Sequence, residues 1–211
     1  MAVTDVPPPV TDRRRERGDR TRRAILEAAA RLASTEGLEG LSIGRLAEHL
    51  EISKSGLYAH FRSKEELQLA TIAMAAEMYE RDLIKPALQA PPGRDRLLRF
   101  ADLFLDYVRD GPFPGGCFFI ASTMDPARQR DRVRDALAAI QGELLGFFEA
   151  CIGKARELRQ LPSAIDPAQL AFAIDGALIG ADLNYLLFGD ARFLERGRVE
   201  VRQLLSNPGG A

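Results

Sequence analysis

Apolar residues recur at helical spacing along almost the whole chain. From Gly18 onward they follow an i, i+3, i+4, i+7 pattern, which places apolar side chains on one face of a helix. The residues that set this pattern are Ala24, Ile25, Ala28, Ala29 and Leu32. Gly37 offers an end to the helix, because glycine adopts the left-handed conformation at little cost. The pattern therefore predicts an amphipathic helix between Gly18 and Gly37.

Three serines mark the starts of the next three helices, since a serine side chain can accept a backbone N–H at a helix N-terminus. They are Ser42, Ser53 and Ser63. The first two precede short helices, and the second of these carries Leu57 and Phe61 on its inner face. The third precedes Glu66 in a capping box and starts a long helix that runs towards Pro86.

Proline and glycine divide the rest of the chain into further helices. Asp125-Pro126 and Asp166-Pro167 each place a capping carboxylate before a proline, which suits the first helical position. The second of these helices should stop at Gly189, and a last helix should cover residues 193–205. No useful alternating β pattern or internal repeat is found, so the sequence predicts an all-α fold of about nine helices.

Composition narrows the class of protein. The 211 residues are 46% apolar and 28% charged, which is sufficient for a sizeable core. The net charge is −1, but residues 1–64 hold 12 Lys or Arg against 9 Asp or Glu, and residues 65–211 hold 17 against 21. A basic head on an acidic body indicates a local anionic partner. With no secretory signal and no apolar run of about 18 residues, we expect a cytoplasmic protein with no membrane partner.

The two ends of the chain should lie outside the packed core. Residues 1–17 combine Pro7-Pro8-Pro9 with a charged run and are expected to form a mobile arm. That arm is either a solvated tail or a basic segment that touches a phosphate backbone. Residues 207–211 are expected to be a frayed tail.

The most informative segment is residues 41–64. Two short amphipathic helices are separated by about three residues, which is the spacing of a helix-turn-helix, whose second helix enters the DNA major groove. At about 100° per residue, Leu57 and Phe61 face inward while Ser55, Gly56 and Ala59 face outward. Small, polar side chains on the outer face let a helix approach base edges closely.

Residues 21–67 resemble the DNA-binding domain of the TetR family of transcriptional regulators. The matching positions include Arg23 to Leu26, Ala29, Gly37, Leu41-Ser42, Leu46-Ala47 and Ile52-Ser53, and the string LYAHFRSKEEL is the most specific. The resemblance implies a set of DNA-contacting residues, namely Ser53, Lys54, Ser55, Gly56, Tyr58 and His60. It also implies phosphate contacts from Ser42 and Lys64. His60 has an alternative role as a helix-end residue that hydrogen-bonds within its own domain.

One position departs from the family pattern. Glu51 stands in the turn where the family usually has glycine. A residue other than glycine in the left-handed region costs roughly 1 kcal/mol, so we expect local strain in this turn.

The resemblance also organises the rest of the chain. It implies a DNA-binding domain over residues 18–64, joined by a long helix to a ligand-binding and dimerisation domain over residues 65–206. The last two helices would form a four-helix interface with a second copy; their candidate contacts are Gly176, Gly180, Leu183, Leu187, Val201 and Leu204. The alternative for each is packing inside the chain's own core.

The middle helices are rich in aromatic residues, and a subset of them is expected to line a cavity for a small molecule. The candidate ligand residues are Phe104, Tyr107, Cys117, Phe147, Phe172 and Asp175. Asp175 has three possible partners: an arginine, the dimer interface or the ligand. Cys117 and Cys151 are expected to be core residues, with thiol sensing as the alternative.

The function expected from these features is a homodimeric repressor, released from a palindromic DNA operator by a small, largely apolar effector. Ligand binding would favour one tilt of the long helix that starts at Lys64 and thereby reset the spacing of the two heads. An enzyme and a purely structural helical protein are the alternatives. Against an enzyme, we find no phosphate loop, no Gly-x-Ser-x-Gly motif and no His-x-x-x-His pair, and we expect no cofactor or metal.

Overall fold

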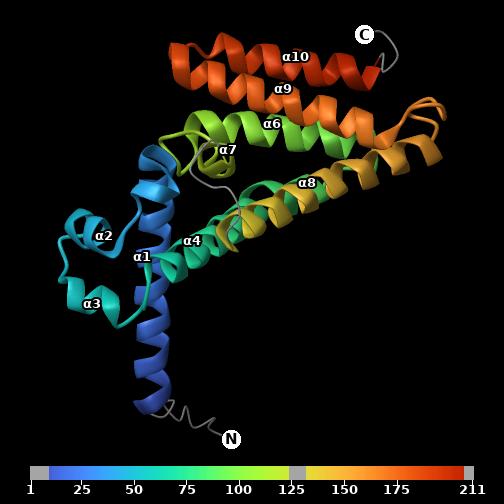
Figure 1. Ribbon diagram of the computed structural model, residues 1–211. Coiled ribbons are helices and arrows are strands. Elements are labelled where there is room, and N and C mark those ends of the chain that lie inside the picture. The colour runs from blue at the N-terminus through green and yellow to red at the C-terminus, as the bar shows by residue number, and fades with distance from the viewer. Residues whose placement is uncertain (1–9, 124–131, 207–211) are drawn as a thin grey trace, which may run out of the picture.

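The computed structural model describes residues 10–123 and 132–206, and every regular element in these ranges is helical (Figure 1). The head contains α1 (Val10–Gly40), α2 (Ile43–His49) and α3 (Lys54–Tyr58). Next come α4 (Lys64–Tyr79), the π-helix η1 (Glu80–Ile84) and α5 (Lys85–Leu88). The body adds α6 (Arg94–Asp110), α7 (Phe118–Thr123), α8 (Arg132–Glu157), α9 (Pro167–Phe188) and α10 (Arg192–Ser206). The predicted all-α fold is confirmed.

The head is a small cluster built on one side of α1, and α4 leaves it diagonally towards the body (Figure 1). All three serine caps are present: the hydroxyls accept backbone N–H groups at distances of 3.1, 3.2 and 3.0 Å from Arg45, Gly56 and Glu66. The Glu66 carboxylate accepts the N–H of Arg62, at 2.9 Å, instead of that of Ser63. The capping box therefore reaches back one residue further than the motif requires.

The first helix starts earlier than the sequence suggested. It begins at Val10, so residues 10–17, which were expected to belong to a mobile arm, are helical. Gly37 has φ 74° and interrupts the helical backbone, as expected from its position. The expected helix start at Asp125-Pro126, like residues 1–9 and the tail 207–211, lies outside the described residues.

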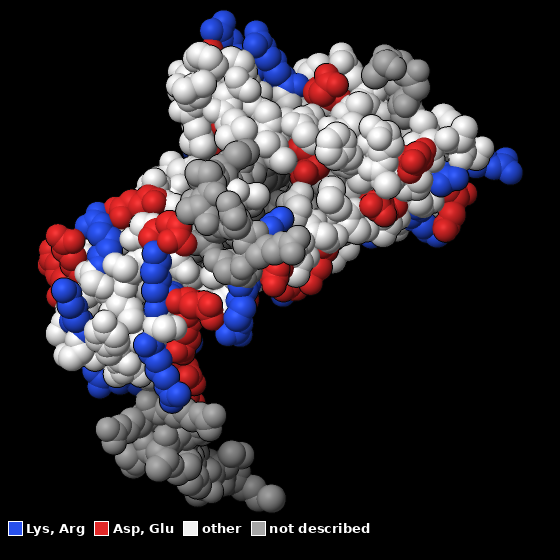
Figure 2. Space-filling view, in the orientation of Figure 1, with Lys and Arg blue, Asp and Glu red and all other residues white. Residues whose placement is uncertain are grey.

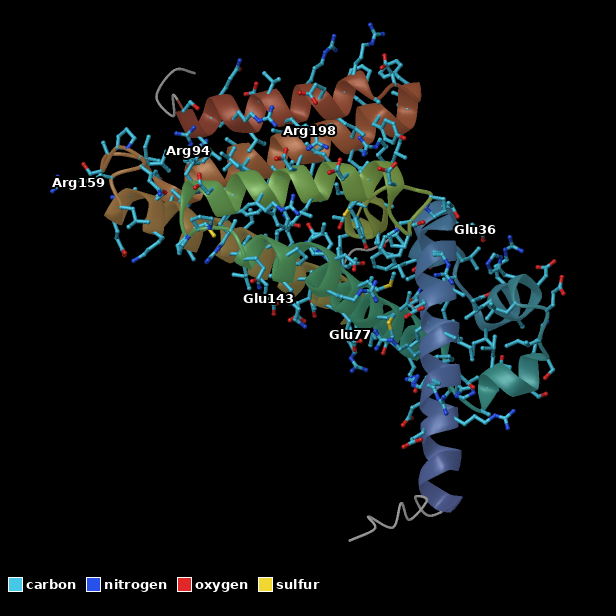
Figure 3. The ribbon with its side chains drawn as sticks, turned by 180° about the vertical axis from the view of Figure 1, so that it is seen from behind. Glu36, Glu77, Arg94, Glu143, Arg159 and Arg198 are labelled. Carbon is cyan, nitrogen blue, oxygen red and sulfur yellow. The ribbon has the colours of Figure 1, made fainter. Side chains whose placement is uncertain are left out.

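In the body, α9 packs against both α10 and α8, and α6 contacts all three of these helices (Figure 1). Gly197 allows α10 to approach α9 closely, because a Cβ atom there would lie only 2.7 Å from the Cβ of Ala181. Arg198 ties α10 to α6 by donating to Asp102 at 2.7 Å and to Asp106 at 2.5 Å, and Figure 3 shows it reaching between these helices. Steric fit and a charge-assisted network thus fix the position of α10.

The long helix after the head contains a wider turn that the sequence pattern did not predict. At η1 the N–H of Lys85 donates to the carbonyl of Glu80, five residues earlier. Pro86 follows directly; it has no N–H, and its ring clashes with a regular helical carbonyl. A π turn absorbs that mismatch and lets the chain continue as α5 to Leu88.

Two helices of the body, α8 and α9, are long and apolar enough to cross a membrane by length and composition alone. In this fold they pack against each other, and both contribute side chains to the cavity described below. Their apolar character therefore has a use within the folded chain.

One buried carboxylate lies where α9 meets the loop before α7. Asp182 is 0% exposed, and its Oδ2 accepts the backbone N–H of Cys117 at 3.3 Å, while its Oδ1 has no hydrogen-bond partner. Burial raises the pKa of Asp182 from 3.8 to about 6. Gly116 is required here, because a Cβ atom would overlap the Asp182 carboxylate.

The turn between α2 and α3 should relax when its strained residue is replaced. Glu51 has φ 54°, which confirms the left-handed backbone expected at this position. The free energy of unfolding of the Glu51→Gly variant, measured by urea denaturation, should be about 1 kcal/mol higher than that of the wild-type protein. Glu48→Gly is the matched control inside α2 and should lose a similar amount. A loss of stability in Glu51→Gly would contradict the strain assigned to this turn.

Asp182 should make stability depend on pH in a defined direction. Because its pKa is higher in the folded than in the unfolded chain, its contribution is greatest below pH about 4 and is lost as the pH rises through about 6. Asp182→Asn should therefore be more stable than wild type at pH 7.5, by on the order of 1 kcal/mol, and should lose this advantage at pH 4. The pKa of Asp190 is lowered by Arg192, so Asp190→Asn should show no such gain. Equal free energies of unfolding for Asp182→Asn and wild type at pH 7.5 would contradict the raised pKa assigned to Asp182.

Candidate nucleic-acid interface and effector cavity

The outer face of α3 is bare, as the helical spacing predicted. Leu57 and Phe61 are both 0% exposed, and the guanidinium of Arg22 lies 4.6 Å from the centre of the Phe61 ring. The remaining α3 side chains point outward, and Tyr58 is 57% exposed. The exposed residues that the sequence assigned to DNA contact are Ser53, Lys54, Ser55, Gly56 and Tyr58. Leu57 and Phe61 therefore anchor this segment, while the small, polar side chains of α3 face the solvent.

The flanking candidates are already engaged within the head. The Ser42 hydroxyl accepts an N–H as the cap of α2, which leaves its own proton available to a phosphate oxygen. Lys64 donates to the Glu39 carboxylate at 2.8 Å and to its carbonyl at 2.7 Å. His60 is half-buried, with its ring centroid 6.2 Å from that of Phe61.

Charge on the head is mixed. Figure 2 shows Lys and Arg side chains interleaved with carboxylates around α1, α2 and α3. Arg45 donates hydrogen bonds to two of these carboxylates, Glu36 and Glu48. The hydrogen bond to Glu36 lowers the pKa of that carboxyl group. This network braces α2 against α1 near the labelled Glu36 in Figure 3.

The body contains a cavity of about 600 Å³ enclosed by α4, η1, α6, α7, α8 and α9. Four of the six predicted ligand residues line it: Phe104, Cys117, Phe147 and Asp175. The sequence-based prediction did not include the cavity wall formed by α4 and η1, which contributes Glu77, Tyr79 and Glu80, among others. The helical spacing of residues 73, 76, 77, 80 and 84 is the signal that could have revealed this second face.

Two predicted cavity residues lie elsewhere. Tyr107 is buried beside Tyr79, with ring centroids 6.3 Å apart, and does not line the cavity. Phe172 is 68% exposed on the outer face of α9. At about 100° per residue it aligns with Gly176 and Leu183 and not with the inner face of the helix.

That outer face forms an apolar stripe. Leu183 and Leu187 are 39% and 75% exposed, and no atom lies within 4 Å of where a Cβ would stand on Gly176 or Gly180. These four predicted interface residues therefore face open space, together with Phe172. Val201 was assigned wrongly: it is 0% exposed and belongs to the chain's own core. Leu204 is partly buried against the same core.

The cavity shares walls with the elements that hold the head. Glu77 of α4 lines the cavity and pairs with Arg23 of α1 at 3.0 Å. The buried Gln68 of α4 donates to the carbonyl of Leu38 at the end of α1. Just before α7, Gly115 donates its N–H to the Ser34 hydroxyl of α1 at 3.3 Å. Both α4 and the segment before α7 are therefore bonded directly to α1.

The chemistry of the cysteines disfavours thiol sensing. Burial raises the pKa of Cys117 to about 12, so its thiol stays protonated at neutral pH. Burial also raises the pKa of Cys151. Across residues 10–123 and 132–206, no cluster of three or more His, Cys, Asp or Glu is arranged to hold a metal ion.

Two family models match the chain. Residues 25–71 match the model of bacterial regulatory proteins of the tetR family, and residues 93–201 match the tetracyclin repressor-like C-terminal domain. The first match covers the helix-turn-helix, and the second covers most of the body.

Individual proteins are also similar to this chain over most of the length of both. The HTH-type transcriptional repressor NemR of Escherichia coli K12 is 23% identical over 190 residues, which are 89% of this chain and 95% of NemR. A TetR transcriptional regulator from Chloroflexus aurantiacus has a similar structure, with TM-score 0.84, 23% identity and coverage of 91% and 97% of the two chains.

A further similar structure is AibR in complex with isovaleryl coenzyme A and operator DNA. Its TM-score is 0.72 at 23% identity, and the match covers 88% of this chain and 98% of AibR. Together, the two family models span the helix-turn-helix and more than half of the chain. The chain belongs to the TetR family of transcriptional regulators.

Proposed function

We propose that the protein is a homodimeric transcriptional repressor, released from a palindromic operator by a small molecule that binds in the body cavity. The observation that carries this proposal is the one-sided burial of α3: Leu57 is buried, as is Phe61 shortly after the helix, and the other residues of α3 are exposed. The exposed face of α3 carries a lysine and small side chains but no carboxylate, which suits close approach to DNA. AibR, of similar fold, has been solved with both operator DNA and a small molecule.

In this proposal the outer face of α3 enters the major groove. Ser55 and Gly56 approach base edges, while Lys54 and Tyr58 are placed to reach the groove walls. His60, at the end of the helix, is included in the contact set. Ser42 and Lys64 contact phosphates, and Lys64 would share its charge between Glu39 and the DNA.

The apolar stripe on α9 supplies the dimer contact. An exposed set of Phe172, Leu183 and Leu187, with open space above Gly176 and Gly180, suits close packing against a second copy. Pairing would bring two α3 helices to successive major grooves, about 34 Å apart.

The route from cavity to DNA runs through shared helices. An effector that favours one position of α4 or α7 also favours one position of α1, because both helices contact α1 beside the cavity. The coupling is reciprocal, so an effector that releases DNA must bind more weakly to the DNA-bound protein.

We propose no enzymatic activity and a cytoplasmic location. Among the described residues no histidine lines the cavity, and its one thiol, Cys117, is held protonated by burial. The described lining therefore offers neither a histidine base nor a thiolate nucleophile.

A carboxylate on α3 should abolish DNA binding without harming the fold. Footprinting on DNA flanking the protein's own gene first supplies an operator. Ser55→Glu places a negative charge in the first turn of α3, where the helix dipole favours it, but opposes it to DNA phosphates. Operator affinity should fall by about a hundredfold or more, as measured by fluorescence anisotropy.

The matched control is Ser163→Glu, an equally exposed serine between α8 and α9. It adds the same charge far from the head and should leave affinity and its salt dependence unchanged. If Ser55→Glu binds the operator as tightly as wild type, α3 is not the reading helix and the proposed function fails.

A further inference from the structure

The charges around the body cavity are all of one sign among the described residues. Four carboxylates line it, and no Lys, Arg or His does; the carboxylates are Glu77, Glu80, Glu143 and Asp175. Glu77 is paired with Arg23, at 3.0 Å, and Glu80 is paired with Lys85, at 3.3 Å. Neither Asp175 nor Glu143 has a cationic partner within the described ranges. The cavity thus holds negative charge that the described protein does not neutralise.

Asp175 is the inner of these two groups. It is half-buried on α9, and its Oδ2 accepts one hydrogen bond, from the Gln141 amide at 2.9 Å. Burial raises its pKa, which shows that the surroundings penalise its charge. A carboxylate withdrawn from water is costly unless a cation or further donors compensate it. A ligand that brings a positive charge would supply that compensation.

Glu143 lies nearer the surface. In Figure 3 it projects from α8 along the same edge of the body as Glu77 from α4, where these helices run side by side. It is exposed, so its interaction with a bound charge is screened by water. Its position suits attraction of a cation towards the cavity more than tight binding.

Aromatic rings complete the site. Tyr79, Phe104, Phe119 and Phe147 line the cavity, and the rings of Tyr79 and Phe119 meet edge to face with centroids 5.6 Å apart. Ring faces attract organic cations. Tyr79 is only 8% exposed, so its ring is largely sheltered from water.

From this combination of a cavity, aromatic walls and carboxylates without a cationic partner among the described residues, we infer that the effector is a lipophilic organic cation: an apolar or aromatic body that carries one ammonium group. This inference rests on the proposed function and names the ligand class of the same cavity. It also separates the chain from AibR, whose solved ligand, isovaleryl coenzyme A, carries phosphates that this acidic lining would repel.

The test uses three probes that share a naphthylmethyl group: the trimethylammonium salt, the neutral alcohol and the sulfonate. Isothermal titration calorimetry with the full-length protein should show the cation binding at least about tenfold more tightly than the alcohol, with no binding of the sulfonate. Equal affinity for the cation and the alcohol, tighter binding of the sulfonate, or no saturable binding of the cation would overturn the inference.

Variants locate the charge that is responsible. Asp175→Asn should weaken cation binding about tenfold and leave the alcohol unaffected. Glu143→Gln should weaken it only about threefold, because that carboxylate is exposed. Glu149→Gln, an exposed glutamate of α8 outside the cavity, is the control and should change nothing. If Asp175→Asn does not fold, as judged by circular dichroism, the Glu143→Gln result decides, and unchanged affinity there would contradict the inference.

Operator binding without any probe separates this inference from the proposed function. Failure of the cation to bind, while the protein still binds its operator, would remove the ligand class alone. A protein that binds the cation through Asp175 but never binds DNA would retain the cation site and lose the repressor assignment.

Discussion

Burial of Leu57 and Phe61 is the interaction on which the head depends. Leu57 is the buried residue of a five-residue helix that is too short to be stable alone, and Phe61 is buried shortly after the helix ends. Both are fully buried, and Arg22 of α1 covers the Phe61 ring. Because only one narrow stripe of α3 is used for packing, the other residues stay free for a partner. The same arrangement therefore gives stability to the head and a bare surface to the solvent.

The second constraint is that α1 belongs to both parts of the molecule. It packs against α2 within the head and against α4 and α7 at the body. The polar links across this junction are few and specific, including Gln68 to the end of α1 and Gly115 to Ser34. Residues of α4 and α7 line the cavity, so under the proposed function its occupant would contact the helices that position the head. A π turn at Glu80–Ile84 forms part of that wall, at a place where such turns often accompany function.

Local chemistry made much of this structure predictable from the sequence. The serine caps, the Asp166 cap and the stop at Gly189 each depend on one residue and its near neighbours, and all are present. The left-handed backbone at Glu51 was expected from the family resemblance, because the family usually has glycine at this position.

The features that depend on distant neighbours could not be predicted in this way. Phe172 was expected in the cavity but is exposed, and Val201 was expected at the dimer interface but is buried in the core. Helical spacing shows which residues share a face but not what covers that face. The α4 wall of the cavity was missed for the same reason. The uneven charge of the cavity became visible only when residues from α4, η1, α8 and α9 were brought together in space.

Affinity cleavage of the operator is the most direct test of the claim that the α3 helices of two copies bind the operator together. Arg62→Cys places one exposed thiol just after α3, while Cys117 and Cys151 are buried, so an iron chelate can be attached selectively. The account predicts two clusters of strand cuts, symmetric about the operator centre and separated by about one helical turn or a multiple of it. An operator-bound protein that gives a single cluster, or no cuts, would contradict it.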